Sequence, residues 1–352
     1  MRKVLLDRNE NHYGPAPACE NVLKNLSVDL LYDYSRDFQR GHYSSLSERL
    51  AELLRVDENR IVLGYGCEDL LKQAIHHFLR PGERCFIPSA SWWYYGSIAD
   101  EVRGTTIKYP IVERQDDYVF DVDALMRLHA KMPARVLLIS SPNNPTGNTF
   151  PRERLEEVLE YFRDAVVVLD EAYWGFVDED DESSTPLLTE KYPNLLVLRT
   201  FSKLYALAGA RIGYGIAGRG MDSFLRFSAR NLGYNRISEQ LALAALGSPE
   251  YYRDVRKKMA QDRELFIEAI RPFDQVRAYK SSANFLLIRL PEHLKVGLHE
   301  ALTSTGLQIK FFDEPSFINC ARITLGTQEE NKELREVLVY YLSELLGRAD
   351  ES

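Results

Sequence analysis

The chain has 352 residues, of which 45% are hydrophobic and 27% are charged, and its formal net charge is −8. Because a typical domain has ~150 residues, this length predicts two domains, or one large domain with a smaller partner. The acidic balance and the lack of a Lys/Arg-rich block argue against nucleic acid as a partner.

The sequence also argues against export, membrane insertion and metal binding. The apolar run Val4–Leu6 is shorter than the roughly 7–15 apolar residues of a secretory signal, and no stretch reaches the ~18 apolar residues of a membrane span. The cysteines are scattered, and no two histidines have the spacing of metal ligands. We therefore expect a cytoplasmic protein with no disulfide framework, no membrane partner and no metal.

The first 250 residues alternate helical patterns with short apolar runs. Residues 46–54, 70–78 and 151–162 have the apolar spacing of helices. Strands are expected at residues 60–63, 83–87, 105–109, 134–140, 165–170, 194–201 and 211–217. Near-continuously apolar strands that alternate with helices are typical of a mostly parallel sheet covered on both faces. We therefore predict a large α/β domain over residues 31–250.

The last third of the chain has a different pattern. A long charged helix over residues 250–270 is followed by expected strands at 281–290, 307–312 and 321–326, and a final helix has its apolar stripe from Leu334 to Leu346. This α+β pattern predicts a smaller domain over residues 251–352. Residues 1–30 fit neither pattern, and we expect them to form a segment that packs with the small domain.

Residues with reactive side chains gather in TFSKLYALAGARIGYG (residues 200–215). Lys203 follows an expected strand, so its amine should lie at the carboxyl edge of the sheet, where α/β proteins bind ligands. A partly desolvated lysine is a nucleophile toward aldehydes, and Thr200, Ser202 and Arg211 suit a phosphate group. The alternative, a surface lysine on a loop, does not account for the whole cluster.

Asp170 ends an expected buried strand in VVVLDEAYWGF (residues 166–176) and should reach the same edge. A carboxylate there needs a cation. A protonated pyridinium nitrogen would serve, and its protonation would make the ring an electron sink. Tyr173 could reach the phenolic oxygen of such a ring. Taken alone, Asp170 is more typical of a helix N-cap.

Two turn segments accompany these residues. In SSPNNPTGN (residues 140–148), Asn144 precedes Pro145, which restricts its backbone and helps to aim its side chain. In GYGCEDLL (residues 64–71), Gly66 and Cys67 open a helix whose backbone N–H groups can bind phosphate. The second pattern is not G-x-G-x-x-G, which weakens a nicotinamide interpretation. By themselves the two segments also fit an ordinary loop and a plain strand–turn–helix junction.

Together, NNPTG, DEAY and TFSKLYALAGARIGYG resemble, in order and spacing, the fold-type I pyridoxal-phosphate (PLP) enzymes of the aspartate aminotransferase superfamily. The opening LDRNENHYGPAP and the closing NCARITLGTQEEN are similar to those of the histidinol-phosphate aminotransferases, so the resemblance spans nearly the whole chain. It implies an aminotransferase that moves an amino group from an amino donor, histidinol-phosphate-like or another amino acid, to a 2-oxo acid such as 2-oxoglutarate. It also implies a homodimer with shared active sites.

The resemblance assigns the matching residues to roles at the cofactor. Lys203 is the Schiff-base lysine and the proton shuttle, Asp170 pairs with the pyridine nitrogen, and Asn144 and Tyr173 hydrogen-bond the ring hydroxyl. Hydroxyls, a guanidinium and backbone amides hold the phosphate, from Thr200, Ser202, Arg211, Gly66 and Cys67.

At the substrate, the resemblance implies that Arg322 binds the carboxylate with its planar fork and that Tyr13 lines the pocket. Tyr34 is expected to reach the phosphate of the partner subunit's cofactor.

Three positions and the segment SRDFQRGHYSS (residues 35–45) depart from the family pattern. The residue that stacks on the cofactor ring is usually a tyrosine, whereas IPSASWWYYG offers Trp92, with Trp93 as a competitor. His12 stands where the family has proline. Lys310 stands where the family has an arginine that helps to bind the substrate phosphate, and a lysine binds phosphate as a point charge without the fork. These changes bear on the substrate rather than on the cofactor.

Three other functions are open at this point. A PLP lyase, such as a decarboxylase acting on an amino-acid phosphate, would share all these motifs, because the pocket selects which bond breaks. A regulator built on an aminotransferase domain would carry an added DNA-binding domain, whereas the family pattern here begins by residue 9. The last alternative is an unrelated α/β binding protein whose motifs match by chance.

Overall fold

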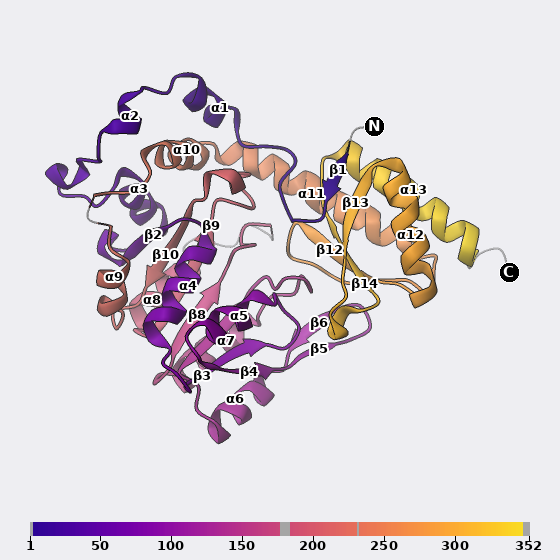
Figure 1. Cartoon of the computed structure of the whole chain (residues 1–352), viewed down its shortest axis with the longest axis horizontal. Helices are drawn as coiled ribbons and strands as arrows, with labels where there is room; N and C mark the ends of the chain where they lie inside the picture. Colours follow the sequence, from indigo (N-terminus) through magenta and orange to yellow (C-terminus); the bar gives the residue numbers. More distant parts are fainter. Residues whose placement is uncertain (1–2, 177–183, 231, 348–352) are drawn as a thin grey trace.

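The computed structural model describes residues 3–176, 184–230 and 232–347. The chain forms a large domain around a seven-stranded sheet and a smaller domain around a five-stranded sheet (Figure 1). The predicted ranges 1–30, 31–250 and 251–352 also include residues 1–2, 177–183, 231 and 348–352, which lie outside the described residues.

The large sheet has the order β2-β10-β9-β8-β7-β3-β4. Strand β10 is antiparallel to both neighbours, and the other pairings are parallel, so the sheet is mostly parallel, as the sequence predicts. In sheet order the strands are β2 (Ile61–Gly64), β10 (Gly213–Ala217), β9 (Leu195–Thr200), β8 (Val166–Asp170), β7 (Val136–Ser140), β3 (Arg84–Pro88) and β4 (Thr105–Tyr109).

Both faces of this sheet are buried, because its central strands carry apolar side chains at nearly every position. In β8, Val167 and Leu169 join one hydrophobic cluster and Val166 and Val168 join the other, as the two-residue period of a strand requires. Three helices cover the face of Val166 and Val168: α4 (Cys67–Phe78), α5 (Tyr94–Glu101) and α9 (Asp222–Ser228). The opposite cluster contains residues of α3 (Ser45–Leu54), α6 (Val122–Lys131), α7 (Arg152–Tyr161) and α10 (Arg236–Leu246), with α8 (Ser184–Lys191) packed against it.

Strand β10 begins two residues later than the predicted 211–217. Residues Ala208–Ala210 form the 3-10 helix η3, and Arg211 after it has φ 52°, in the left-handed region that a strand does not use. The chain enters the sheet only at Gly213, where a Cβ atom would lie 2.3 Å from the carbonyl carbon of Gly66. Glycine therefore permits the close approach of β10 to the turn before α4.

The small sheet has the order β1-β13-β14-β12-β11, with β1 parallel to β13 and the other pairs antiparallel. Its strands are β1 (Val4–Leu6), β13 (Leu307–Phe311), β14 (Cys320–Thr324), β12 (Phe285–Arg289) and β11 (Arg277–Ala278). Its helices are α11 (Pro249–Ile270), α12 (Glu292–Thr305) and α13 (Gln328–Leu346). The last helix begins with a capping box between Thr327 and Glu330, which satisfies two free backbone N–H groups.

The amino-terminal residues contact both domains. Strand β1 lies in the small sheet, whereas α1 (Pro17–Lys24) packs on α10 of the large domain, where Cys19 Sγ donates to the Leu241 carbonyl at 3.5 Å. After α1 the chain runs along the side of the large domain that faces away from the small domain (Figure 1). This stretch contains α2 (Asp29–Tyr32) and the 3-10 helix η1 (Asp37–Arg40), and two further 3-10 helices are η2 (Glu58–Arg60) and η4 (Pro315–Phe317).

A hairpin of the large domain, β5 (Ile111–Glu113) with β6 (Tyr118–Phe120), lies beside the small sheet. Glu113 accepts hydrogen bonds from Tyr279 Oη at 2.5 Å and from Arg289 Nη2 at 2.7 Å, and Arg277 Nη1 lies 3.2 Å away. The first hydrophobic cluster also runs without a break from the large domain into the small one. The two domains are therefore joined by a shared core and by ion pairs at its edge. Across the described ranges, no helix is both long and apolar enough to cross a membrane.

Candidate functional site

The site lies at the carboxyl edge of the large sheet, where β8 and β9 end. Lys203 follows β9, and its Nζ donates to the carbonyl oxygen of Arg8 at 3.0 Å. The same nitrogen lies 5.5 Å from the centre of the Tyr173 ring. The lysine amine is thus placed between the loop after β8 and the amino-terminal segment, at the ligand-binding edge of an α/β sheet.

Asp170, the last residue of β8, is buried and accepts three hydrogen bonds. Its donors are Tyr95 Oη at 2.8 Å, the Ala172 amide at 3.0 Å and Cys67 Sγ at 3.3 Å. Burial raises the pKa of Asp170, and the three donors partly oppose that rise. Residues 171–176 form turns rather than a helix, so Asp170 is not the helix N-cap that the sequence alone left open.

A group of residues that could bind an anion lies beside Asp170. Gly66 has φ 88° and precedes α4, and a Cβ atom on it would lie 2.7 Å from Arg211 Nη2. The Arg211 guanidinium therefore covers the start of α4, where free backbone N–H groups point out of the helix. Thr200 Oγ1 and Ser202 Oγ lie 2.9 Å apart on the adjoining turn. A guanidinium, two hydroxyls and a helix start together suit a phosphate group.

Asn144 and Arg322 meet across the two domains. Arg322 Nη1 donates to Asn144 Oδ1 at 2.5 Å and Arg322 Nη2 donates to the Asp7 carbonyl at 2.6 Å. Burial lowers the pKa of the Arg322 guanidinium. Lys310 is opposite Arg322 in the register of β13 and β14, and its side chain is exposed. Strand β14 therefore presents a buried arginine to the site, with a solvated lysine on the adjoining strand.

The candidate aromatic residues fall in different places. Tyr173 is buried, accepts a hydrogen bond from Asn9 Nδ2 at 2.8 Å and packs edge-on against Phe285. Trp92 is half-buried and packs edge-on against Tyr95, 5.5 Å between ring centres, whereas Trp93 is 64% exposed. The structure favours Trp92 over Trp93 as the aromatic residue next to Asp170.

Tyr13 and Tyr34 have different surroundings. Tyr251 Oη donates to the Tyr13 carbonyl, Lys258 Nζ lies 5.6 Å from the Tyr13 ring, and burial beside Asp262 raises the pKa of Tyr13 to about 12. Tyr13 thus packs against α11 and lies near the start of α13, where Gln328 and Glu330 affect its pKa. Tyr34 is 65% exposed in the stretch between α2 and η1.

The residues around Asn9 contribute more to the site than their sequence indicates. Residues Asp7–Asn11, the amino-terminal strap, touch most of the site. Asp7 and Arg8 offer their carbonyl oxygens to Arg322 and Lys203, Asn9 bonds Tyr173, and Asn11 Nδ2 donates to the Leu204 carbonyl at 2.8 Å. Tyr95 is a further site residue that the sequence did not predict, and its only sequence signal is its position about one helical turn after Trp92.

Comparison with known proteins identifies the family. Residues 2–338 match the family described as aminotransferase class I and II. The chain belongs to this family. It is 34% identical to the histidinol-phosphate aminotransferase of Leuconostoc mesenteroides, over 94% of this chain and 89% of that protein. It is 30% identical to the histidinol-phosphate aminotransferase of Ruminiclostridium cellulolyticum, over 96% of this chain and 92% of that protein.

Solved aminotransferases share the fold. The histidinol-phosphate aminotransferase of Sinorhizobium meliloti, in complex with pyridoxal-5'-phosphate, superposes with a TM-score of 0.85 at 24% identity, covering 97% of this chain and 91% of that one. The L-threonine-O-3-phosphate decarboxylase of Porphyromonas gingivalis superposes with a TM-score of 0.77 at 22% identity, covering 97% and 99%. The expected fold type I architecture and the resemblance to the aminotransferases are confirmed.

The described part of the chain contains no cluster of metal-ligating side chains. No three His, Cys, Asp or Glu side chains there are grouped so that they could hold a metal ion. The four cysteines are free and buried.

Proposed function

We propose that this chain is a PLP-dependent aminotransferase of the histidinol-phosphate aminotransferase type. It moves an amino group between an amino donor and a 2-oxo acid such as 2-oxoglutarate. The observation that carries the proposal is the convergence of an amine, a buried carboxylate and an anion site at one sheet edge, from Lys203, Asp170 and the Gly66–Arg211 cradle.

The residues present fit the cofactor. Asp170 is buried, and its three hydrogen-bond donors are neutral. Among the described residues, no lysine, arginine or histidine lies within ion-pairing distance of its carboxylate. A protonated ring nitrogen of the cofactor would therefore supply the missing cation. Lys203 would bind the aldehyde carbon, and the Gly66–Arg211 cradle would hold the phosphate with Thr200 and Ser202. Asn144 and Tyr173 would bind the ring hydroxyl, and Trp92 would stack on the ring. When bound, the cofactor supplies the electron sink that stabilises a carbanion.

Lys203 and Arg322 are the two residues that we expect to act directly on the substrate. Lys203 Nζ would hold the cofactor, and from the same edge of the sheet it would also be placed to carry a proton to or from the substrate α-carbon. Arg322 would bind the substrate carboxylate with the fork of its guanidinium, replacing its present bond to Asn144 or sharing it. Burial of Arg322 strengthens that ion pair, because water does not screen it.

The donor we propose is a phosphate-bearing amine such as histidinol phosphate. Two observations support it: the names of the relatives above, and the exposed cation of Lys310 opposite Arg322 in the sheet register. Tyr13, whose backbone N–H donates to Asn11 Oδ1, would line the substrate pocket. The second candidate is a decarboxylase acting on an amino-acid phosphate, which the likeness of the fold to the Porphyromonas enzyme keeps open.

The active form we propose is a cytoplasmic homodimer with shared sites. Large apolar side chains are exposed along residues 23–43, namely Leu23, Val28, Leu31, Tyr32, Tyr34, Phe38 and Tyr43. An exposed apolar stretch of this kind marks an interaction surface. A second copy seated there would bring Tyr34 to its neighbour's cofactor phosphate.

An absorbance spectrum of the purified protein tests the proposal. A visible band from lysine-bound PLP that histidinol phosphate removes and a 2-oxo acid restores would support it. Carbon dioxide release without a 2-oxo acid would favour the decarboxylase, and the absence of any band after PLP is added would overturn both. The Lys203→Ala variant should lose turnover while still folding, and substantial activity in it would contradict the role of Lys203.

A further inference from the structure

Two residues connect Asp170 to the rest of the site, and neither is among the residues that we expect to bind the substrate. Tyr95 lies on α5, about one turn after Trp92, and donates its hydroxyl to Asp170 Oδ2 at 2.8 Å. Cys67 is the first residue of α4, and its thiol donates to Asp170 Oδ1 at 3.3 Å. Each oxygen of this carboxylate therefore has its own side-chain donor, from a different helix.

We propose that Tyr95 and Cys67 are positioning residues that hold the Asp170 carboxylate in place beneath the cofactor ring. This inference rests on the proposed function and deepens it. Cys67 links two contacts of the cofactor, because its backbone amide opens the helix of the phosphate cradle while its thiol bonds the carboxylate. Tyr95 also links two residues that we expect to contact the cofactor, because its ring packs against Trp92 while its hydroxyl donates to the Asp170 carboxylate.

Burial keeps both groups in the form that donates. Tyr95 and Cys67 are buried, and burial together with the Asp170 charge raises the pKa of each well above its usual value. Each therefore keeps its proton and can donate only to Asp170 or to a near neighbour. Glu171, which follows Asp170 in the chain and also raises its pKa, is paired with Arg199 at 2.7 Å. These donors oppose the effect of burial on the pKa of Asp170 and so favour its charged form, which is the form that a protonated ring nitrogen requires.

Matched substitutions test the role of Tyr95. Tyr95→Phe removes only the hydroxyl, and Tyr94→Phe removes a hydroxyl from the preceding residue of the same helix. The measurement is the dissociation constant of PLP from each purified protein, with the thermal midpoint of the cofactor-free form as a check on folding. We expect Tyr95→Phe to weaken PLP binding about tenfold, the size of a lost hydrogen bond to a charged group. Tyr94→Phe should bind as the natural protein does.

Substitutions at Cys67 provide an independent test, which holds even where Tyr95→Phe fails to fold. Cys67→Ala removes the donor and should weaken PLP binding, whereas Cys67→Ser keeps a hydroxyl donor and should restore most of it. Cys85→Ala removes another buried thiol, on β3, and is the control. Equal binding by Tyr95→Phe and Tyr94→Phe, or by Cys67→Ala and Cys67→Ser, would overturn the inference. A natural protein that shows no PLP band would instead overturn the proposed function, so the two failures are distinguishable.

Discussion

Arg322 Nη1 lies 2.5 Å from Asn144 Oδ1, which joins a strand of the small domain to the loop after β7 of the large one. The group that we expect to bind the substrate carboxylate is therefore in direct contact with the group that we expect to bind the cofactor hydroxyl. On these proposed roles, substrate binding and cofactor binding would share one hydrogen bond, and a change at either residue should affect both.

Replacement of Arg322 by lysine should raise the Michaelis constants for the amino donor and for the 2-oxo acid together. The lysine keeps the charge and loses the planar fork, and we expect a loss of about 2 kcal/mol of binding free energy for each substrate. Steady-state kinetics with both substrates varied would measure it. Arg49→Lys, on the exposed side of α3, is the control. An effect on one substrate alone would contradict a common carboxylate site.

Replacement of Lys310 by alanine should affect only a donor that carries a phosphate. We expect the Michaelis constant for that donor to rise about threefold to fivefold, because a solvent-exposed contact of one lysine with a phosphate contributes at most about 1 kcal/mol. The Michaelis constant for the 2-oxo acid should stay the same. Lys332→Ala, on exposed α13, controls for the change in net charge. A parallel rise for both substrates would place Lys310 in the carboxylate site instead.

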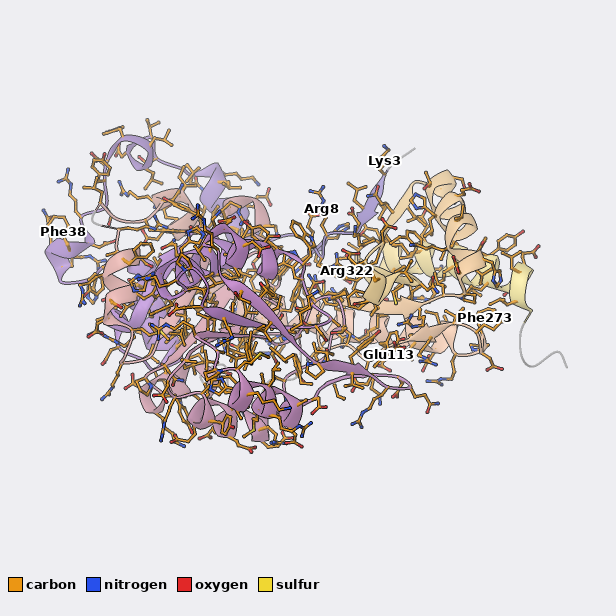
Figure 2. The ribbon with its side chains drawn as sticks, turned by 60° about the horizontal axis from the view of Figure 1, so that its bottom comes forward. Lys3, Arg8, Phe38, Glu113, Phe273 and Arg322 are labelled. Atoms are coloured by element: carbon orange, nitrogen blue, oxygen red, sulfur yellow. The ribbon has the colours of Figure 1, made fainter. Side chains whose placement is uncertain are left out.

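Glu113 should stabilise the protein at neutral pH and lose this effect in acid. Burial alone would raise the pKa of Glu113, but Tyr279, Arg289 and Arg277 outweigh it and hold the pKa below its ordinary value. A carboxyl group with a lowered pKa stabilises the folded state above its ordinary pKa and loses that effect as the pH falls through the folded value. Glu113 lies at the contact between the domains in Figure 2.

The Glu113→Gln variant should therefore be less stable than the natural protein by about 1 kcal/mol at pH 7, because the group is partly exposed. The difference should shrink as the pH falls below the ordinary glutamate range of about 4.3. Thermal unfolding of both proteins at neutral and acid pH would measure it, with Glu153→Gln of α7 as control. A difference that grows in acid would contradict the assignment.

A charge on the exposed apolar stretch should separate the proposed dimer. Phe38 is 70% exposed at the edge of the large domain farthest from the small one (Figure 2). Phe38→Asp should shift the sedimentation coefficient to that of a monomer and lower the activity, because the site would lose Tyr34 of its neighbour. Val296→Asp is the matched control, since Val296 is 67% exposed on α12 of the small domain. If Phe38→Asp remained a dimer, the interface would have to lie on another part of the surface.

The sequence predicted the central strands well, because their apolar runs are local signals. Strands β7 and β8 lie within one or two residues of the predicted 134–140 and 165–170. The hairpin β5–β6 was not predicted, since its two strands have three residues each and its hydrogen bonds to Arg289 and Tyr279 depend on the assembled fold. The pairing of Tyr95 with Asp170 was missed for the same reason: the two residues are 75 positions apart.

The residues around Lys203 and Asn144 were accessible to sequence reasoning because each follows a strand whose end could be predicted. The residues that these side chains contact in the amino-terminal strap could not be predicted, because the strap comes from the other end of the chain. Asn9, with φ 56°, is buried and bonds Tyr173, and no periodicity in residues 7–11 indicates that contact.

The strap also determines when the site can form during synthesis. The Asn9 amide donates to Thr324 Oγ1 at 3.0 Å, across 315 positions of sequence. A ribosome that makes ~5–20 residues per second needs tens of seconds to deliver Thr324 after Asn9. Over that interval the strap has no Thr324 to bind, so the large domain can fold well before the lysine amine acquires its final surroundings. The strap can therefore reach its final position only after the strand that carries Thr324 has been made.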